Sequence, residues 1–505
     1  MTAAVQPIEI ATLMEESGVK FGTSGARGLA CAMTDRVCYA YTAAFVQHLA
    51  ESDGIVETEE VALAGDRRPS TPRILQAVAQ ALRDYSLTPR YFGAIPTPAL
   101  ALHGMQAGVP AIMVTGSHIP DDRNGIKFYR AEGEILKEDE AGIRAQQVIP
   151  TAEFDAHGML LAPAPLPPEE RIAYADYVRR FLDFYPNSPL QGRRIALYGH
   201  SSVAREALGE ILRGLGASVI PLGFSEPFIP VDTEAIRPED VALARQWARE
   251  IGFDAICSAD GDGDRPLIGD ARGEWLRGDI AGILCARHLG AQVVATPVSS
   301  NSAVEKCGTF RRVLRTRIGS PYVIAAMRQA MQQGERGVVG YEANGGFLIG
   351  DPLQSNGRTL APLPTRDCTV VILGVLVEAF RQGLSVEALV NSLPPRFTYS
   401  DRLKAFPTEI SQARLAELQS GDPARDFAAI EALFGGRFGK VAETDHTDGL
   451  RITFENGEVA HIRPSGNAPE LRCYNEADSE ARAQEMNRQC LEALRGWLPA
   501  GWRGA

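Results

Sequence analysis

The sequence lacks the features that would place it in a membrane, on nucleic acid or outside the cell. It has no stretch of about 18 unbroken apolar residues, so we expect no transmembrane helix. Its net charge is −12 and like charges do not cluster in long blocks, which argues against nucleic acid or an anionic membrane as the main partner. The N-terminal MTAAVQPIEIATLMEESG has neither the basic region nor the apolar core of a secretory signal.

The chain also lacks ordered cysteine spacing. Its eight cysteines are scattered, and none forms a Cys-x-x-Cys pair. Disulfide frameworks and zinc sites show regular spacing, whereas scattered cysteines are typical of reduced thiols. We therefore expect a cytoplasmic protein with free cysteines.

The length of the chain predicts several domains. A chain of 505 residues is too long for one hydrophobic core, and the prior is two to four domains. The clearest linker is LLAPAPLPPEE, residues 160–170, where prolines interrupt any regular element. Strands alternate with helices before and after it, which predicts an α/β fold with three similar mixed α/β domains and a smaller α+β C-terminal domain. The expected boundaries are 1–160, 161–277, 278–396 and 397–505.

Local patterns predict individual elements. The apolar run AIMV, residues 111–114, is typical of a buried strand, and TPRILQAVAQALRDY, residues 71–85, has helical spacing. The segment 193–223 predicts a strand, a helix and a strand. Asn456-Gly457, within an alternating segment, is a strong hairpin signal.

The segment DGDGDRP, residues 260–266, predicts a metal site. Asp260, Asp262 and Asp264 alternate with glycine, so an extended loop can turn all three carboxylates toward one point. Their mutual repulsion is removed by a divalent cation that prefers oxygen ligands. An EF-hand does not fit, because the loop lacks that motif's glycine and glutamate at the required positions. The alternative is a solvated acidic turn.

Ser117 follows the apolar run 111–114, where a strand is expected to end. In open α/β sheets, ligands bind outside the carboxyl ends of strands. If the Ser117 hydroxyl carries a phosphoryl group, that group can supply an oxygen that a nearby Mg²⁺ needs. A hydrolase is less favoured, because no Gly-x-Ser-x-Gly occurs and His118, the next residue, is badly placed to be the base for Ser117. The structural alternative is a helix N-cap.

Three further loops are candidates for binding a sugar phosphate. FGTSGARG, residues 21–28, offers backbone amides and Arg27, and RPSGNAPELR, residues 463–472, offers a second anion site. GYEANGGF, residues 340–347, sets an acid and an amide two residues apart, which suits sugar hydroxyls. Ordinary turns are the alternative for each loop taken alone.

Taken together, FGTSGARG, TGSHIPDDRNGIKFY, DGDGDRP, GYEANGG and RPSGNAPELR, in this order, resemble the α-D-phosphohexomutase superfamily. The resemblance spans the chain from Phe21 to about Arg472. It implies four domains around a central cleft, each contributing one loop. It also implies Mg²⁺ as cofactor, a hexose 1,6-bisphosphate as intermediate and activator, and a small sugar phosphate as substrate, in a monomer or homodimer.

The resemblance assigns roles residue by residue. Ser117 is similar to the serine that carries the phosphoryl group, and it would share the Mg²⁺ with Asp260, Asp262 and Asp264. Residues matching those at the reacting phosphate or in proton transfer are His118, Lys127, Arg27 and Arg265. Residues matching the sugar loop and the distal phosphate loop are Glu342, Asn344, Arg463, Ser465, Gly466 and Asn467.

The substrate is the least constrained expectation. Mannose 6-phosphate, converted to mannose 1-phosphate, is the preferred hypothesis. The Glu-Ala-Asn of residues 342–344 departs from the Glu-Met-Ser or Glu-Glu-Ser typical of mannose and glucose enzymes, and favours a glucosamine- or acetylglucosamine-phosphate as the alternative. Glucose phosphate comes next. Alternatives of other classes are a phosphatase, in which water takes the phosphoryl group from Ser117, and a sugar-phosphate-binding protein without activity.

Overall fold

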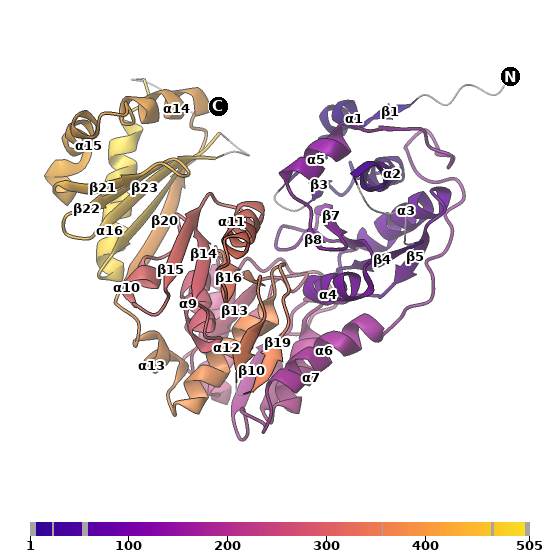
Figure 1. Ribbon diagram of the computed structural model, residues 1–505, viewed down its shortest axis with the longest axis horizontal. Coiled ribbons are helices and arrows are strands. Elements are labelled where there is room, and N and C mark those ends of the chain that lie inside the picture. The colour runs from indigo at the N-terminus through magenta and orange to yellow at the C-terminus, as the bar shows by residue number, and fades with distance from the viewer. Residues whose placement is uncertain (1–6, 23–24, 53–58, 356, 466–468, 500–505) are drawn as a thin grey trace. The chain divides into compact units, whose positions relative to one another are not determined.

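The structure, a computed structural model, describes residues 7–22, 25–52, 59–355, 357–465 and 469–499 (Figure 1). The chain divides into two compact units. The first comprises Met1–Val294 and Gly319–Val390, and the second comprises Ala295–Ile318 and Asn391–Ala505. The predicted boundaries 1–160, 161–277, 278–396 and 397–505 remain a prediction, and the third predicted domain contributes residues to both units.

The N-terminal part of the first unit is built on a mixed sheet in the order β2-β3-β7-β6-β4-β5, with β8 paired to β7. Its centre is parallel, since β4 pairs in parallel with β5 and β6, whereas β7 runs antiparallel to β6. Every residue of β6 is buried, as expected for a strand covered on both faces. The strands are β1 (Ile8–Glu9), β2 (Lys20–Phe21), β3 (Ala26–Leu29), β4 (Glu60–Gly65), β5 (Thr88–Tyr91), β6 (Ala111–Val114), β7 (Arg123–Arg130), β8 (Gly133–Glu134) and β9 (Gln147–Val148). The helices are α1 (Ile10–Ser17), α2 (Asp35–Ser52), α3 (Thr71–Asp84), α4 (Thr97–Ala107) and α5 (Lys137–Arg144).

The next part repeats this plan on a smaller sheet, in the order β11-β10-β12-β13. Strand β10 is parallel to β11 and β12, and β13 returns antiparallel beside β12. The strands are β10 (Arg194–Tyr198), β11 (Ser218–Leu222), β12 (Ala255–Ala259) and β13 (Pro266–Gly269). The helices are α6 (Ile172–Phe184), α7 (Arg205–Gly214) and α8 (Pro238–Ile251).

The last part of the first unit has a third antiparallel pair, β16 and β17. The buried helix α12 packs against α9, and Asp367 caps its N-terminus by accepting a hydrogen bond from the backbone amide of Thr369. The helices are α9 (Gly278–His288), α11 (Ser320–Gln332), α12 (Cys368–Arg381) and α13 (Val386–Val390). The strands are β16 (Val338–Tyr341), β17 (Phe347–Ile349), β18 (Leu353–Ser355) and β19 (Arg358–Leu360), while β14 (Val293–Pro297) lies at the division between the units.

The second unit contains an antiparallel sheet in the order β20-β24-β23-β22-β21, against which α16 packs (Figure 1). The predicted Asn456-Gly457 hairpin joins β22 to β23 and is confirmed. The strands are β15 (Arg312–Thr316), β20 (Phe397–Leu403), β21 (Val441–Asp445), β22 (Leu450–Phe454), β23 (Val459–Pro464) and β24 (Leu471–Ala477). The helices are α10 (Ala303–Lys306), α14 (Thr408–Glu417), α15 (Pro423–Phe438) and α16 (Glu480–Arg495).

The three α/β parts place one loop each at an equivalent position. Residues 115–122 join β6 to β7, residues 260–265 join β12 to β13, and residues 342–346 join β16 to β17. In each case a loop turns the chain from one strand into its antiparallel neighbour. No fixed-period sequence repeat accompanies this, so the similarity between the parts is one of topology.

Candidate active site

The serine loop is held in a conformation that serine rarely adopts. Ser117 is fully buried and has φ of 56°, in the left-handed region that favours glycine. Its amide donates to Thr115 Oγ1 at 2.8 Å. Strain of this kind persists only where the surroundings impose it. The helix N-cap alternative is wrong, because the element that follows Ser117 is strand β7.

Arg68 imposes this loop conformation. Its side chain is 1% exposed and forms an ion pair with Asp66 at 2.9 Å. Its guanidinium donates to the carbonyl oxygens of Ser117 at 2.9 Å and Ile119 at 2.6 Å. A further hydrogen bond of 2.6 Å reaches the carbonyl of Pro120. One buried arginine therefore donates to three carbonyl oxygens of the loop that presents Ser117.

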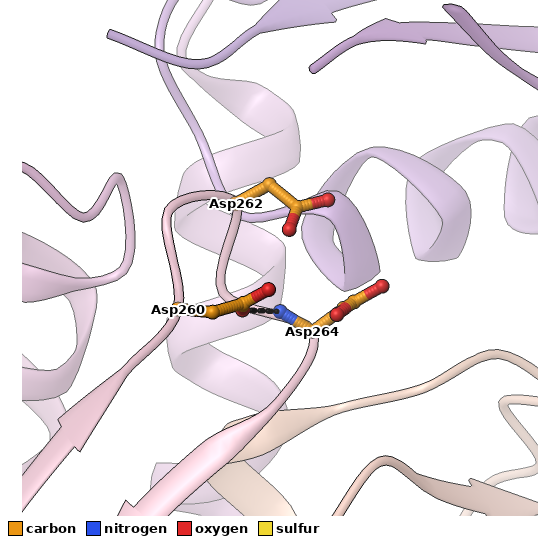
Figure 2. Close-up of side chains that lie close together, drawn as sticks. All are labelled: Asp260, Asp262 and Asp264. Atoms are coloured by element: carbon orange, nitrogen blue, oxygen red, sulfur yellow. Dashed lines mark hydrogen bonds between the residues drawn. The ribbon is translucent and has the colours of Figure 1, made fainter. Parts of the chain in front are cut away.

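The metal loop gathers its three aspartates as predicted (Figure 2). Asp260, Asp262 and Asp264 are buried, and one oxygen from each lies within 4.8 Å of the others. Asp260 Oδ1 accepts from the backbone amides of Asp264 and Arg265, both at 3.1 Å, so the loop folds back on its first aspartate. Ser117 donates its hydroxyl to Asp260 Oδ2 at 2.5 Å, which brings the serine to the metal loop.

The electrostatics of this loop fit a divalent cation. Burial, followed by the charges of Asp262 and Asp264, raises the pKa of Asp260 well above its ordinary value. The buried oxygens Asp262 Oδ1 and Asp264 Oδ1 have no hydrogen-bond partner among the described residues. Crowded carboxylates with unsatisfied oxygens are the ligands that Mg²⁺ prefers. The residues that would hold it are Asp260, Asp262, Asp264 and Ser117.

Lys127 is the first cation beside the aspartates. It lies on β7, is 1% exposed, and donates through Nζ to Asp262 Oδ2 and Asp264 Oδ2, both at 2.6 Å. Although burial acts in the other direction, the charges of Arg366, Lys127 and Arg265 hold the pKa of Asp264 below its ordinary value. Asp264 is therefore a carboxylate at neutral pH.

His118, Arg27 and Arg265 complete the surroundings of Ser117. The Nδ1 atom of His118 lies 3.3 Å from Ser117 Oγ, so the two side chains are in contact, and the expectation that His118 is badly placed to be the base for Ser117 stays a prediction. The charge of Arg265, burial and the charge of Arg27 lower the pKa of His118 to about 2, which keeps its ring neutral. Burial, together with Arg265 and Arg366, lowers the pKa of Arg27 to about 10, so Arg27 stays charged at neutral pH.

The sugar loop is a tight turn that keeps Glu342 and Asn344 together. The amide of Glu342 donates to the carbonyl of Gly346 at 3.0 Å, and Asn344 Oδ1 accepts from the amide of Gly346 at 2.9 Å. Thr233 donates to the carbonyl of Asn344 at 2.8 Å. The turn network expected as the alternative is therefore present, and it engages the Asn344 side-chain oxygen rather than the Glu342 carboxylate.

The distal phosphate loop belongs to the second unit. Arg463 forms an ion pair with Asp448 at 2.9 Å, and the amide of Ser465 donates to the carbonyl of Glu470 at 2.8 Å. Gly466 and Asn467, the other two residues predicted for this loop, lie outside the described residues.

Two arginines at the site were not predicted from the sequence. Arg68 follows β4, the parallel neighbour of β6, and a basic residue at the carboxyl end of a neighbouring strand is a signal that could have found it. Arg366 precedes α12 and reaches Asp264 and Glu342. No local pattern around Arg366 indicates this, since its partner Asp264 lies 102 residues earlier.

The chain is similar to known proteins over nearly its whole length. Family descriptions match in order: phosphoglucomutase/phosphomannomutase α/β/α domain I at residues 18–148, domain II at 173–273, domain III at 277–397 and the C-terminal domain at 412–493. A phosphomannomutase of Sinorhizobium fredii is 44% identical, covering 94% of this chain and 99% of its own length. A phosphomannomutase of Salmonella muenchen is also 44% identical, covering 96% and 98%.

A solved structure supports the fold. A phosphoglucomutase/phosphomannomutase family protein of Burkholderia thailandensis superposes with a TM-score of 0.70 at 19% identity, covering 96% of this chain and 98% of its own. The chain belongs to the phosphoglucomutase/phosphomannomutase family, and the predicted four-domain α/β fold is confirmed. In the described part of the chain, no helix is both long and apolar enough to cross a membrane.

Proposed function

We propose that the protein is a phosphomannomutase that moves a phosphoryl group between C6 and C1 of mannose through a phosphoserine at Ser117. The observation that carries the proposal is the 2.5 Å contact between Ser117 Oγ and Asp260 at the buried aspartate cluster. The names of the two 44% identical relatives support mannose phosphate as substrate.

The first half-reaction transfers the phosphoryl group from Ser117 to the sugar. The free hydroxyl oxygen of the hexose phosphate attacks phosphorus and its proton passes to His118. The bond from phosphorus to Ser117 Oγ breaks, and the product is a hexose 1,6-bisphosphate. Phosphoryl transfer depends on positioning and charge neutralisation. Arg27, Arg265 and Lys127 supply positive charge for the three phosphoryl oxygens. Mg²⁺ bound to the aspartates would act as a Lewis acid on the Ser117 oxygen.

His118 takes part in proton transfer in this proposal. Its pKa is low chiefly because of the charge of Arg265, and burial and then the charge of Arg27 lower it further. A phosphate dianion on Ser117 opposes the positive charges of both arginines. It therefore raises the pKa of His118 above the value that His118 has beside the free serine. The imidazole is therefore a better proton acceptor when the serine is phosphorylated than when it is free.

The second half-reaction returns the other phosphate to Ser117 after the bisphosphate has turned end for end. Glu342 and Asn344 accept and donate hydrogen bonds to the sugar hydroxyls in both orientations. The proposal assigns the phosphate that is not reacting to the distal loop, with Arg463, Ser465, Gly466 and Asn467 as its ligands. A trace of bisphosphate activates the enzyme, because it phosphorylates any Ser117 that has lost its phosphate.

The cellular setting is part of the proposal. All eight cysteines are free, which supports a reducing compartment and thus the cytoplasm. The ligand is a small sugar phosphate, and a monomer or homodimer remains a prediction. A phosphoglucosamine or acetylglucosamine-phosphate mutase is the second candidate, because Glu342-Ala343-Asn344 places an amide in the sugar loop.

The proposal is tested by isomerisation of mannose, glucose, glucosamine and acetylglucosamine phosphates with Mg²⁺ and a trace of hexose 1,6-bisphosphate. We expect the highest kcat/KM for mannose phosphate. Ser117→Ala should fold and lose at least about 10³-fold in kcat, since it removes the group that carries the phosphate. A preference for an amino sugar would select the second candidate, and phosphate release without isomer would indicate a phosphatase.

A further inference from the structure

Arg366 is a buried arginine placed between two loops of the candidate site. The next residue, Asp367, caps α12 and donates its amide to the carbonyl of Phe347 on β17 at 3.0 Å. This pairing fixes the backbone at Arg366 beside the sugar loop. The side chain is 1% exposed, so its charge must be balanced by groups inside the protein.

One guanidinium holds a carboxylate from each loop. Its Nε donates to Asp264 Oδ2 at 3.1 Å, and Nη2 lies 2.9 Å from the same oxygen. Its Nη1 lies 3.3 Å from Glu342 Oε2. The planar fork of arginine fixes the direction of both bonds at once, which a lysine cannot do.

The sugar loop is shaped around this side chain. A Cβ atom added to Gly346 would lie 2.4 Å from Arg366 Cδ and 2.7 Å from Cγ. The arginine stem therefore occupies the space that a side chain at position 346 would need. Gly346 also closes the turn that presents Glu342, so the stem supports the turn while the guanidinium holds the carboxylate.

Arg366 also gives the two carboxylate oxygens of Asp264 different surroundings. Oδ2 accepts from both Arg366 and Lys127, whereas Oδ1 has no hydrogen-bond partner among the described residues and lies 3.6 Å from Arg265 Nε. With Oδ2 fixed in this way, the carboxylate cannot rotate freely, and Oδ1 is left for a metal ion. Groups that orient a metal ligand from behind typically affect metal affinity as well as activity.

The guanidinium is itself held from the far side. Its Nη1 donates to Ser320 Oγ at 3.2 Å. Ser320 donates in turn to Glu134 Oε2 at 3.1 Å, and Thr365, the neighbour of Arg366, donates to Glu134 Oε1 at 2.7 Å. Glu134 lies on β8, which pairs with the strand that carries Lys127. The arrangement is thus a closed network and not a single contact.

We propose that Arg366 is a positioning residue that couples metal binding to sugar binding. Because the same fork orients Asp264 and Glu342, ordering of Asp264 by Mg²⁺ also orders Glu342 for the sugar hydroxyls. Coupling of this kind is reciprocal, so a bound sugar phosphate tightens Mg²⁺ to the same degree. The inference rests on the proposed function for the role of Glu342, but not for the contact with Asp264.

The test uses variants of the full-length protein and calorimetry without turnover. In the dephosphorylated wild-type protein without hexose 1,6-bisphosphate, which cannot turn over, Kd is measured for Mg²⁺ alone, for mannose 6-phosphate alone, and for each in the presence of the other. We expect each ligand to tighten the other. Adding Arg366→Gln should weaken Mg²⁺ by about 10- to 100-fold and bring the coupling factor close to one. The matched control, Arg381→Gln on the exposed side of α12, should change neither.

Arg366→Lys keeps the positive charge but not the planar fork, and it tests the proposal if Arg366→Gln does not fold. A folded Arg366→Lys should lose most of the coupling because it lacks the fork. Coupling that persists in Arg366→Lys overturns the proposal, as does a Mg²⁺ Kd within twofold of the parent in a folded Arg366→Gln.

A second measurement separates positioning from general support of the fold. In the Glu342→Gln background, Arg366→Lys should no longer change the KM for the sugar phosphate, although it should still weaken Mg²⁺. An equal effect on KM with and without Glu342→Gln would contradict the assignment. If the wild type isomerises no hexose phosphate, the proposed function fails, while the effect of Arg366 on Mg²⁺ binding is still read directly by calorimetry.

Discussion

At the scale of single residues, Lys127 shows how the metal loop can exist before a metal ion binds. Its ammonium lies 2.6 Å from both Asp262 and Asp264, where it offsets the repulsion between buried carboxylates. Removing one partner of a buried charge pair is costly, and Lys127→Met should lower the free energy of unfolding without Mg²⁺ by about 3–5 kcal/mol. Mg²⁺ should stabilise this variant more than the wild type, because the cation then replaces the missing charge.

Thermal and urea unfolding with and without Mg²⁺ measure both effects. Lys20→Met is the matched control: Lys20 on β2 is exposed, so its removal should change stability by no more than about 0.5 kcal/mol. Equal stabilisation of wild type and Lys127→Met by Mg²⁺ would show that the ammonium and the metal ion do not share the same carboxylates.

At the scale of elements, the metal loop depends on a glycine that lets the chain turn between the antiparallel strands β12 and β13. Gly263, between Asp262 and Asp264, has φ of 72°, and a Cβ there would lie 2.8 Å from the Ala204 Cβ. Gly263→Ala should therefore cost about 1–3 kcal/mol in stability and weaken Mg²⁺ binding, since the backbone that spaces the aspartates must shift. Gly436→Ala serves as control: its Cβ meets no atom within 4 Å, and alanine in helix α15 should be neutral or stabilising by up to about 1 kcal/mol. Unchanged Mg²⁺ affinity in Gly263→Ala would mean that the loop geometry tolerates the strain.

The elements themselves were largely predictable from the sequence, because their signals are local. The apolar run 111–114 is strand β6, the helical spacing at 71–85 is α3, and the strand, helix and strand expected within 193–223 are β10, α7 and β11. The backbone conformation at Ser117 was not predictable, because Arg68, which follows strand β4, imposes its φ angle through a hydrogen bond to the Ser117 carbonyl. Arg366 was not predicted for the same reason, because its partners Asp264 and Glu342 lie far from it in the sequence.

At the scale of the whole molecule, acid should weaken each unit through a buried neutral histidine. His200 in the first unit donates its Nε2–H to the carbonyl oxygen of Ala259 at 2.7 Å, and burial lowers its pKa to about 4. His461 in the second unit donates in the same way to Asp448 at 2.6 Å, and burial lowers its pKa to about 4. Above the unfolded pKa of about 6.5 both states are neutral, and there is no effect. Between 6.5 and 4 only the unfolded state takes the proton, so stability falls as the pH falls.

The size of this effect follows from the pKa difference. Each histidine should lower the free energy of unfolding by about 1.4 kcal/mol per pH unit, or about 2 kcal/mol between pH 6.5 and pH 5. Urea unfolding from pH 7.5 to pH 4.5 measures the slope. His461→Gln, whose amide can still donate to the Asp448 carbonyl, should reduce that slope by the contribution of one histidine, about 1.4 kcal/mol per pH unit. The control His157→Gln, at an exposed position, should leave the slope unchanged. A slope that His461→Gln does not alter would mean that the acid sensitivity arises from other groups, such as the carboxylates of the metal loop, and would remove His461 as its cause.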